Sequence, residues 1–258
     1  MNPHAVAFAG WQARLDDACR GLDAIRRVVA LAETASTQDA PETRAARAGT
    51  VVTAWRQTAG RGRFGRSWAD TGEEGVAASL VVQAQPGERL ALVGAIAAAE
   101  ACEASLGAPV GIKWPNDTFV SGRKLAGVLI ERRGDLAVIG IGINALQRGF
   151  PPELSGRATS LAMLGATLDR VDVLAALIRA LDAALSATDE SLAAGFHSRD
   201  VLRGTRALFA TPDGPVEGEV QSIDPLRGLV VRTETGERFL PAQSTSVAEW
   251  GGIRVRAV

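Results

Sequence analysis

The chain has 258 residues, of which 47% are apolar and 22% are charged, and these proportions are ordinary for a soluble globular protein with room for a medium domain and a small one. The formal net charge of −1 gives no global basic field, so a nucleic-acid partner is not expected. No run approaches the roughly 20 apolar residues that a membrane span needs, and the start of the chain does not resemble a signal peptide, so no membrane partner is expected either.

The few cysteines and histidines restrict the chemistry further. Cys19 and Cys102 lie in alanine-rich helical contexts, which favours two free thiols over a disulfide and fits a cytoplasmic protein. His4 and His197 are the only histidines and lie far apart in the sequence. A histidine-based metal site or catalytic triad is therefore not expected.

The hydrophobic pattern predicts four helices and at least ten strands. The predicted helices cover 11–30, 38–47, 88–106 and 170–186. Ser36 or Thr37 is a candidate N-cap of the second helix, and Gly107 closes the third. The strands predicted before residue 200 cover 50–55, 75–84, 110–114, 125–131 and 136–144. Beyond residue 200, short strands separated by turns indicate a small antiparallel barrel, at 205–210, 216–223, 228–232, 237–241 and 246–255.

The segment 57–68, Gln-Thr-Ala-Gly-Arg-Gly-Arg-Phe-Gly-Arg-Ser-Trp, is the most informative part of the chain. With Arg56 it holds four arginines and three glycines in thirteen residues and no acid. Guanidinium groups and accessible backbone N–H groups suit an anion with several oxygens, such as a phosphate, and Phe64 and Trp68 are placed to add an apolar cover. Taken alone, the segment also fits an Arg/Gly nucleic-acid element or a solvated surface loop.

The second motif contains the only two lysines among 28 basic residues, Lys113 and Lys124. They flank Pro-Asn116-Asp117 within a window of twelve residues, which indicates a need for compact ammonium groups. An apolar strand follows Lys124, so we expect its ammonium at the rim of a buried site, stabilising negative charge. Asn116 and Asp117 would hold a nucleotide or Mg²⁺, although a plain hairpin turn fits the same residues.

Two further motifs offer small or hydrogen-bonding residues. In Gly140-Ile-Gly142-Ile-Asn144 the glycines alternate along a predicted strand, so they share one face and permit close approach there. The triplet Ser36-Thr37-Gln38 could read the polar end of a ligand or simply cap a helix. Neither the dinucleotide glycine fingerprint nor the Walker phosphate loop occurs.

Together and in this order, these motifs resemble those of the biotin protein ligases. The similarity covers about 34–150 by motif and about 200–258 by pattern. The matching pieces are Ser36-Thr-Gln38, Gln57-Thr-Ala-Gly-Arg-Gly-Arg-Phe-Gly-Arg-Ser-Trp68, Lys113-Trp-Pro-Asn-Asp117, Lys124-Leu-Ala-Gly-Val-Leu129 and Gly140-Ile-Gly-Ile-Asn144.

This resemblance implies an α+β fold, with a mostly antiparallel mixed sheet, helices on one face and a small C-terminal SH3-like β-barrel. It implies an N-terminal helical extension over 1–33, a catalytic biotin- and ATP-binding domain over 34–199 and the SH3-like domain over 200–258. The implied reaction uses biotin, ATP and Mg²⁺. Biotin is activated as biotinyl-5′-AMP and then transferred to a lysine of a biotin carboxyl carrier protein, by default that of acetyl-CoA carboxylase.

The resemblance also assigns roles by position. Lys124, Arg61 and Arg63 would be catalytic. The residues that would bind biotin are Ser36, Thr37, Gln38, Gln57, Arg61, Gly62, Arg63 and Lys124. The residues on the ATP side would be Arg63, Trp68, Asn116, Asp117, Lys124 and Asn144. One departure is Gln38, where the family most often has asparagine.

Alternatives to a biotin ligase remain at this point. Lipoate or octanoate ligases carry an Arg-Arg-x-x-Gly-Gly-Gly signature, which is missing here, and a non-catalytic biotin or adenylate binder would not need Lys124. About 33 residues precede the first motif, so the resemblance implies a ligase without the DNA-binding domain of bifunctional members. The sequence leaves open whether an edge strand pairs two subunits in a homodimer or the chain is monomeric.

Overall fold

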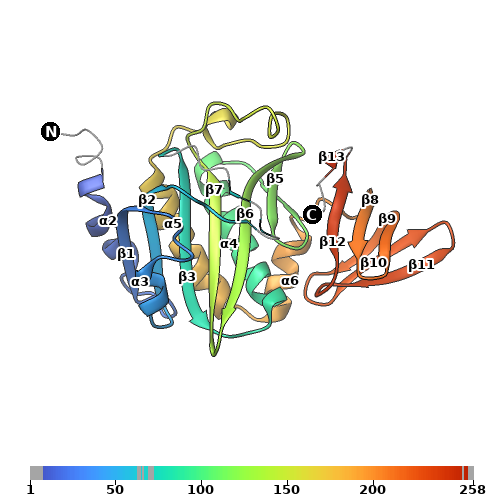
Figure 1. Ribbon diagram of the computed structural model, residues 1–258, viewed down its shortest axis with the longest axis horizontal. Helices are drawn as coiled ribbons and strands as arrows, with labels where there is room; N and C mark the ends of the chain where they lie inside the picture. Colours follow the sequence, from blue (N-terminus) through green and yellow to red (C-terminus); the bar gives the residue numbers. More distant parts are fainter. Residues whose placement is uncertain (1–7, 63–64, 66, 69–72, 252, 255–258) are drawn as a thin grey trace.

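The computed structural model describes residues 8–62, 65, 67–68, 73–251 and 253–254, and it contains two β-sheets (Figure 1). The larger sheet has the strand order β1-β2-β3-β7-β6-β5-β4, in which β1 and β2 are parallel and all other neighbours are antiparallel. Its strands are β1 (Arg27–Thr34), β2 (Thr50–Gln57), β3 (Gly75–Gln83), β4 (Gly111–Lys113), β5 (Asp117–Val120), β6 (Arg123–Arg133) and β7 (Leu136–Asn144). This is the mostly antiparallel mixed sheet that the family resemblance implies.

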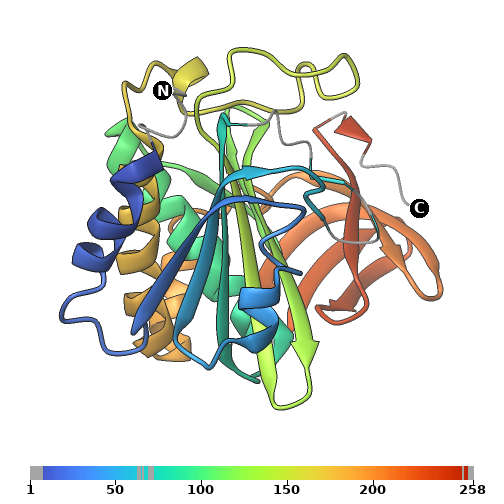
Figure 2. The same ribbon diagram turned by 60° about the vertical axis from the view of Figure 1, so that its left-hand side comes forward.

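Helices cover one face of this sheet. Helices α2 (Trp11–Ala18), α4 (Gly87–Leu106) and α5 (Arg170–Ser186) lie against it, and α6 (Asp189–His197) packs beside α4 (Figure 2). The short helix α3 (Pro41–Ala45) lies on the opposite face, and a 3₁₀ turn, η2, covers Ala162–Leu164. None of the helices among the described residues is long and apolar enough to cross a membrane.

Strand alternation separates the two faces of the sheet. In β7, Ile139 and Ile141 are buried beneath the helices, and a Cβ added to Gly94 of α4 would meet the Ile139 side chain at 3.2 Å. The alternate residues of β7, Gly140 and Gly142, therefore point to the face without the long helices. That face is where small residues leave room above the sheet.

The second sheet is formed by the C-terminal part of the chain, next to the β4–β5 edge of the first (Figure 1). Its strands pair antiparallel in the order β11-β10-β9-β8-β12-β13, which leaves β11 and β13 as edges and is compatible with the predicted SH3-like unit. Their bounds are β8 (Arg206–Thr211), β9 (Gly214–Asp224), β10 (Gly228–Thr233), β11 (Gly236–Pro241), β12 (Ser246–Trp250) and β13 (Ile253–Arg254).

Contacts at the junction connect the first sheet to the segment that leads into the second sheet and to the second sheet itself. The Ile112 N–H in β4 donates to the Arg199 carbonyl (2.7 Å), and the Val201 N–H donates to the Ile112 carbonyl (3.2 Å). The rings of Phe119 in β5 and Trp250 in β12 meet edge to face, with centroids 5.4 Å apart. The C-terminal sheet is therefore attached to the strands that carry the lysine motif.

The first predicted helix is wrong beyond its first half. Helix α2 ends at Ala18, and β1 begins at Arg27, so the short strand expected to lead into Thr34 is present but starts earlier than predicted. The chain turns through Gly21, whose φ is +77°, and the Asp182 carboxylate accepts hydrogen bonds from the N–H groups of Ala24 and Ile25, both at 2.8 Å. These contacts to a distant helix direct the chain into the sheet.

The proposed cap of the second helix is also wrong. Helix α3 is only five residues long and begins after Ala40, whose side chain makes no cap. The Thr37 hydroxyl lies 2.9 Å from that of Ser79 instead. Helix α6 was not predicted, although Thr188 caps it by accepting a hydrogen bond from the Ser191 N–H.

Candidate functional site

A cavity of about 460 Å³ lies on the face of the large sheet that the long helices leave uncovered. Every described residue that the sequence analysis assigned to biotin or ATP lines it, although these residues come from five separate segments of the chain. They are Ser36, Thr37, Gln38, Gln57, Arg61, Gly62, Trp68, Asn116, Asp117, Lys124 and Asn144. Arg63, predicted to contact both ligands, and Phe64 lie outside the described residues.

The glycines of β7 form the floor of this cavity. A Cβ added to Gly140 would lie 2.4 Å from Oε1 of Gln38, and one added to Gly142 would lie 2.5 Å from the Trp68 indole. Both distances are too short for any side chain at these positions without displacement of its neighbour. Glycine is therefore required here so that Gln38 and Trp68 can lie directly on the sheet.

Hydroxyl and amide groups gather at one end of the cavity. Gln57 Oε1 accepts a hydrogen bond from the Thr37 N–H (2.9 Å), and the hydroxyl of Ser79 in β3 lies 2.9 Å from that of Thr37 and 3.0 Å from Gln38 Oε1. Ser36 is buried beside them. This end can recognise a neutral polar group through several short hydrogen bonds with fixed orientation.

Both lysines lie at the other end, around one carboxylate. Lys124 Nζ is 2.7 Å from Asp117 Oδ1, and Lys113 Nζ is 3.9 Å from Asp117 Oδ2. Lys113 is buried, whereas 34% of the Lys124 side-chain surface is exposed. Lys124 also lies over the Trp68 ring, 5.5 Å from its centroid. Two ammonium groups against one carboxylate leave a net positive charge that favours an anionic ligand.

The two asparagines predicted on the ATP side support the walls of this end. Asn116 Nδ2 donates to the Val128 carbonyl (2.6 Å), and Asn144 Nδ2 donates to the Thr159 carbonyl (3.0 Å). The backbone around Thr159 also pairs with that of Lys124, because the Thr159 N–H donates to the Lys124 carbonyl (2.9 Å). Each side-chain amide therefore fixes a neighbouring strand or loop at the cavity wall.

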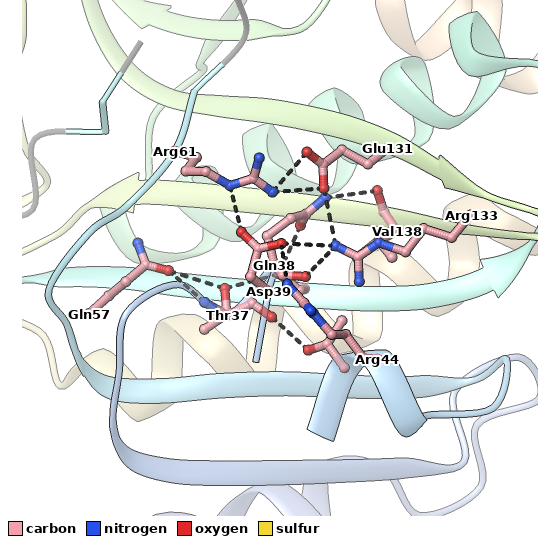
Figure 3. A network of polar contacts seen from close by, with 11 residues as sticks. Thr37, Gln38, Asp39, Arg44, Gln57, Arg61, Glu131, Arg133 and Val138 are labelled. Atoms are coloured by element: carbon pink, nitrogen blue, oxygen red, sulfur yellow. Dashed lines mark hydrogen bonds and ion pairs between the residues drawn. The ribbon is translucent and has the colours of Figure 1, made fainter. Parts of the chain in front are cut away.

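Arg61 makes contacts that the sequence analysis did not anticipate (Figure 3). Its Nε lies 2.7 Å from Asp39 Oδ2, and its Nη2 lies 2.8 Å from Glu131 Oε1. Arg133 bridges the same two carboxylates at 3.3 and 3.2 Å and donates to the Gln38 carbonyl at 2.8 Å. Asp39, Glu131 and Arg133 had no recognisable signal, because their partners are distant in sequence.

Two further segments complete the cavity and were also missed. One is the loop that contributes Phe150, Glu153 and Arg157, and the other is Ser246–Ala248 in β12 of the C-terminal sheet. The Lys124 N–H donates to the Arg157 carbonyl (2.8 Å), which explains why this loop lies against the lysine motif. Both sheets of the molecule therefore contribute to one cavity.

Comparison with known proteins identifies the family. Residues 31–144 match the model of the biotin/lipoate A/B protein ligase family. A biotin–[acetyl-CoA-carboxylase] ligase of Mycobacterium tuberculosis is 35% identical over 189 residues, which cover 68% of this chain and 70% of the relative. A bifunctional ligase/repressor BirA of Bacillus spizizenii is 32% identical over 207 residues, which cover 73% of this chain but only 63% of that protein's length.

A solved structure shows the same fold. The biotin protein ligase from Aquifex aeolicus, in complex with biotin and ATP, superposes with a TM-score of 0.79 at 29% identity, covering 86% of this chain and 99% of that one. The chain therefore belongs to the biotin/lipoate A/B protein ligase family.

Proposed function

We propose that this protein is an ATP-dependent ligase that activates biotin as biotinyl-5′-AMP and transfers it to a lysine of a biotin carboxyl carrier protein. The observation that carries this proposal is the single cavity with a neutral hydrogen-bonding end and a cationic end. Biotin has the matching polarity, with a neutral ureido ring at one end and a carboxylate at the other. The similarity to a ligase structure that holds biotin and ATP supports the same assignment.

In the first step, a carboxylate oxygen of biotin attacks the α-phosphate of ATP, and the bond to pyrophosphate breaks. Both reactants are anions, so their approach requires positive charge held in place beforehand. Lys124 is positioned for this role by Asp117, and buried Lys113 adds a second charge behind it. Thr37, Gln38 and Gln57 would hold the ring system at the opposite end.

Mg²⁺ would accompany the phosphates of ATP. The described residues include no group of three or more His, Cys, Asp and Glu side chains suited to a metal ion. Mg²⁺ bound to nucleotides usually keeps its waters and takes one or two carboxylates in addition to phosphate oxygens. Among the described residues, Asp117 and Glu153 are the carboxylates that line the cavity, so they fit such a site.

In the second step, the amine of a carrier lysine attacks the mixed anhydride, forming an amide and releasing AMP. We assign adenylate formation to residues 34–199 and a supporting role in carrier transfer to 200–258, because β12 borders the cavity. We assign residues 1–33 to a separate N-terminal extension. The reaction requires ATP, and Cys19 and Cys102 are free thiols, as is usual in a reducing compartment. We therefore place the protein in the cytoplasm, with the carrier of acetyl-CoA carboxylase as its expected substrate.

The test is to incubate the protein with MgATP, a carboxyl carrier domain and either biotin or lipoate, and to measure the mass of the carrier. We expect the mass increase of one biotinyl group with biotin and none with lipoate. An increase with lipoate alone would assign the protein to the other branch of its family. A carrier with its acceptor lysine replaced by arginine is the matched control and should gain nothing.

A further inference from the structure

Arg61 lies at the base of the loop between β2 and β3, where backbone contacts close the loop. Arg61 and Ser67 form an isolated antiparallel bridge, and the Trp68 N–H donates to the Gly60 carbonyl (2.9 Å). Gly62 and Trp68 then line the cavity directly. The position of this base therefore decides where Gly62 and Trp68 would meet a ligand.

The Arg61 guanidinium is held by two acids (Figure 3). Its Nε and Nη2 each lie within 2.8 Å of a carboxylate oxygen, one from Asp39 and one from Glu131. Asp39 directly follows Gln38 in the chain, and Glu131 belongs to β6. The guanidinium thus connects the loop base to the turn that carries Gln38 and to strand β6, and both of these contribute residues to the cavity.

Arg133 ties the same carboxylates to the polar end of the cavity. Its Nη2 lies 3.3 Å from Asp39, 3.2 Å from Glu131 and 2.8 Å from the Gln38 carbonyl oxygen. Arg44 adds a longer contact to Asp39, at 3.6 Å. Asp39 and Glu131 therefore link the loop base to the backbone of Gln38, whose side chain lies on Gly140.

We propose that Asp39 and Glu131 are positioning residues, and that the Arg61 side chain acts as an anchor of the loop rather than as a direct contact for the anionic part of the ligand. This inference rests on the proposed function, because the ligand it concerns is biotin and its adenylate. It assigns ligand retention to a pair of acids that never touch the ligand. If Arg61 instead formed a direct ion pair with the anionic part of the ligand, removal of these acids should have the opposite effect on ligand affinity.

The substitutions Asp39→Asn and Glu131→Gln distinguish an Arg61 that anchors the loop from an Arg61 that contacts the ligand. The two roles predict changes in biotin affinity of opposite direction. As an anchor, Arg61 needs the acids, so either substitution should raise the dissociation constant for biotin by about threefold to tenfold, the range for partly exposed charge-assisted hydrogen bonds. If Arg61 contacts the anion directly, neutralising its competing carboxylates should leave the affinity unchanged or tighten it.

A double-mutant cycle isolates the anchor from other consequences of these substitutions. In an Arg61→Ala background, Asp39→Asn should add less than about a twofold further loss, because the contact is already absent. Thermal unfolding of each variant should change little, since a purely structural role would lower stability and affinity together. Arg206→Ala, which removes the exposed ion pair to Glu217 in the second sheet, is the matched control.

Biotin titration into the unmodified protein is the first measurement. Absence of binding there would overturn the proposed function itself. Binding by the unmodified protein with unchanged or tighter binding by both acid variants would overturn the anchor alone. Additive losses in the double mutant would also contradict it.

Discussion

The ammonium nitrogen of Lys124 lies 2.7 Å from Oδ1 of Asp117, while the other oxygen of the same carboxylate faces Lys113 at 3.9 Å. This arrangement orients a lysine at the cationic end of the cavity without neutralising that end. It accounts for why a chain that otherwise uses arginine for positive charge has lysine at these two positions.

Replacing Lys124 by methionine should slow adenylate formation by about two to three orders of magnitude, as for loss of one group that stabilises transition-state charge. Methionine keeps the length of the side chain, so packing over Trp68 should largely persist. The measurement is the single-turnover rate of biotinyl-5′-AMP formation. The control is Arg123→Ala, which removes a neighbouring positive charge on the same strand and should change this rate little. Near-normal rates in the Lys124 variant would remove Lys124 from the mechanism.

Gly140→Ala should weaken biotin binding by about tenfold, because the new methyl group would lie 2.4 Å from Oε1 of Gln38 and overpacking costs about 1–3 kcal/mol. Calorimetric titration with biotin measures the effect. Gly87→Ala, at the start of α4, is the matched control because an added Cβ there meets nothing within 4 Å. Unchanged affinity in the Gly140 variant would show that Gln38 need not lie on the sheet.

Trp250→Ala should loosen the C-terminal sheet from β5. Loss of the edge-to-face contact with Phe119 removes about 0.5–1.5 kcal/mol beyond the area it buries. Because β12 lines the cavity, KM for the carrier should rise more than the rate of adenylate formation falls. Steady-state kinetics with varied carrier measure this, and Phe239→Ala, which removes an exposed aromatic side chain of the same sheet, should leave both values unchanged.

The ion pair of Glu103 and Arg199 should make stability depend on pH. Burial acts to raise the pKa of Glu103, but hydrogen bonds from Arg199 and the Val110 N–H lower it overall. The pair therefore stabilises the fold above the unfolded pKa of the carboxyl group, and this contribution is lost as pH falls through the folded pKa. Urea unfolding should show Glu103→Gln less stable by about 1 kcal/mol at neutral pH, with the deficit shrinking in acid.

Asp200 should make stability depend on pH in the opposite direction. Burial raises the pKa of Asp200 despite the hydrogen bonds from the N–H groups of Leu202 and Arg203. Its ionised form is therefore disfavoured in the folded state, and Asp200→Asn should gain stability relative to the unmodified protein as pH rises. Parallel pH profiles for the Glu103 and Asp200 variants would contradict at least one of the two assignments.

Elements with strong local patterns could be predicted well from the sequence. The strand over Leu136–Asn144 has the predicted bounds, and the helix ending at Leu106 stops at a left-handed Gly107 as predicted. The extended helix at 11–30 failed because Asp182, more than 150 residues away, binds the backbone around Ile25. Local spacing carries no information about such a contact.

The cavity shows the same division between local and distant signals. Motif residues such as Thr37 and Lys124 line the cavity, and they could be singled out in the sequence because their types and order are distinctive. Ser79, Asp39 and Glu131 were missed because each matters through a partner on another strand or loop. Sequence reasoning therefore found the groups assigned to the ligand better than the groups that hold them in place.

The most direct test of the ligase assignment is native mass spectrometry of the protein after incubation with biotin and MgATP, before and after addition of a carboxyl carrier domain. We predict bound biotinyl-5′-AMP that disappears on addition of the carrier, while the carrier gains one biotinyl group. Absence of the adenylate, or an adenylate that persists while the carrier stays unmodified, would contradict the assignment.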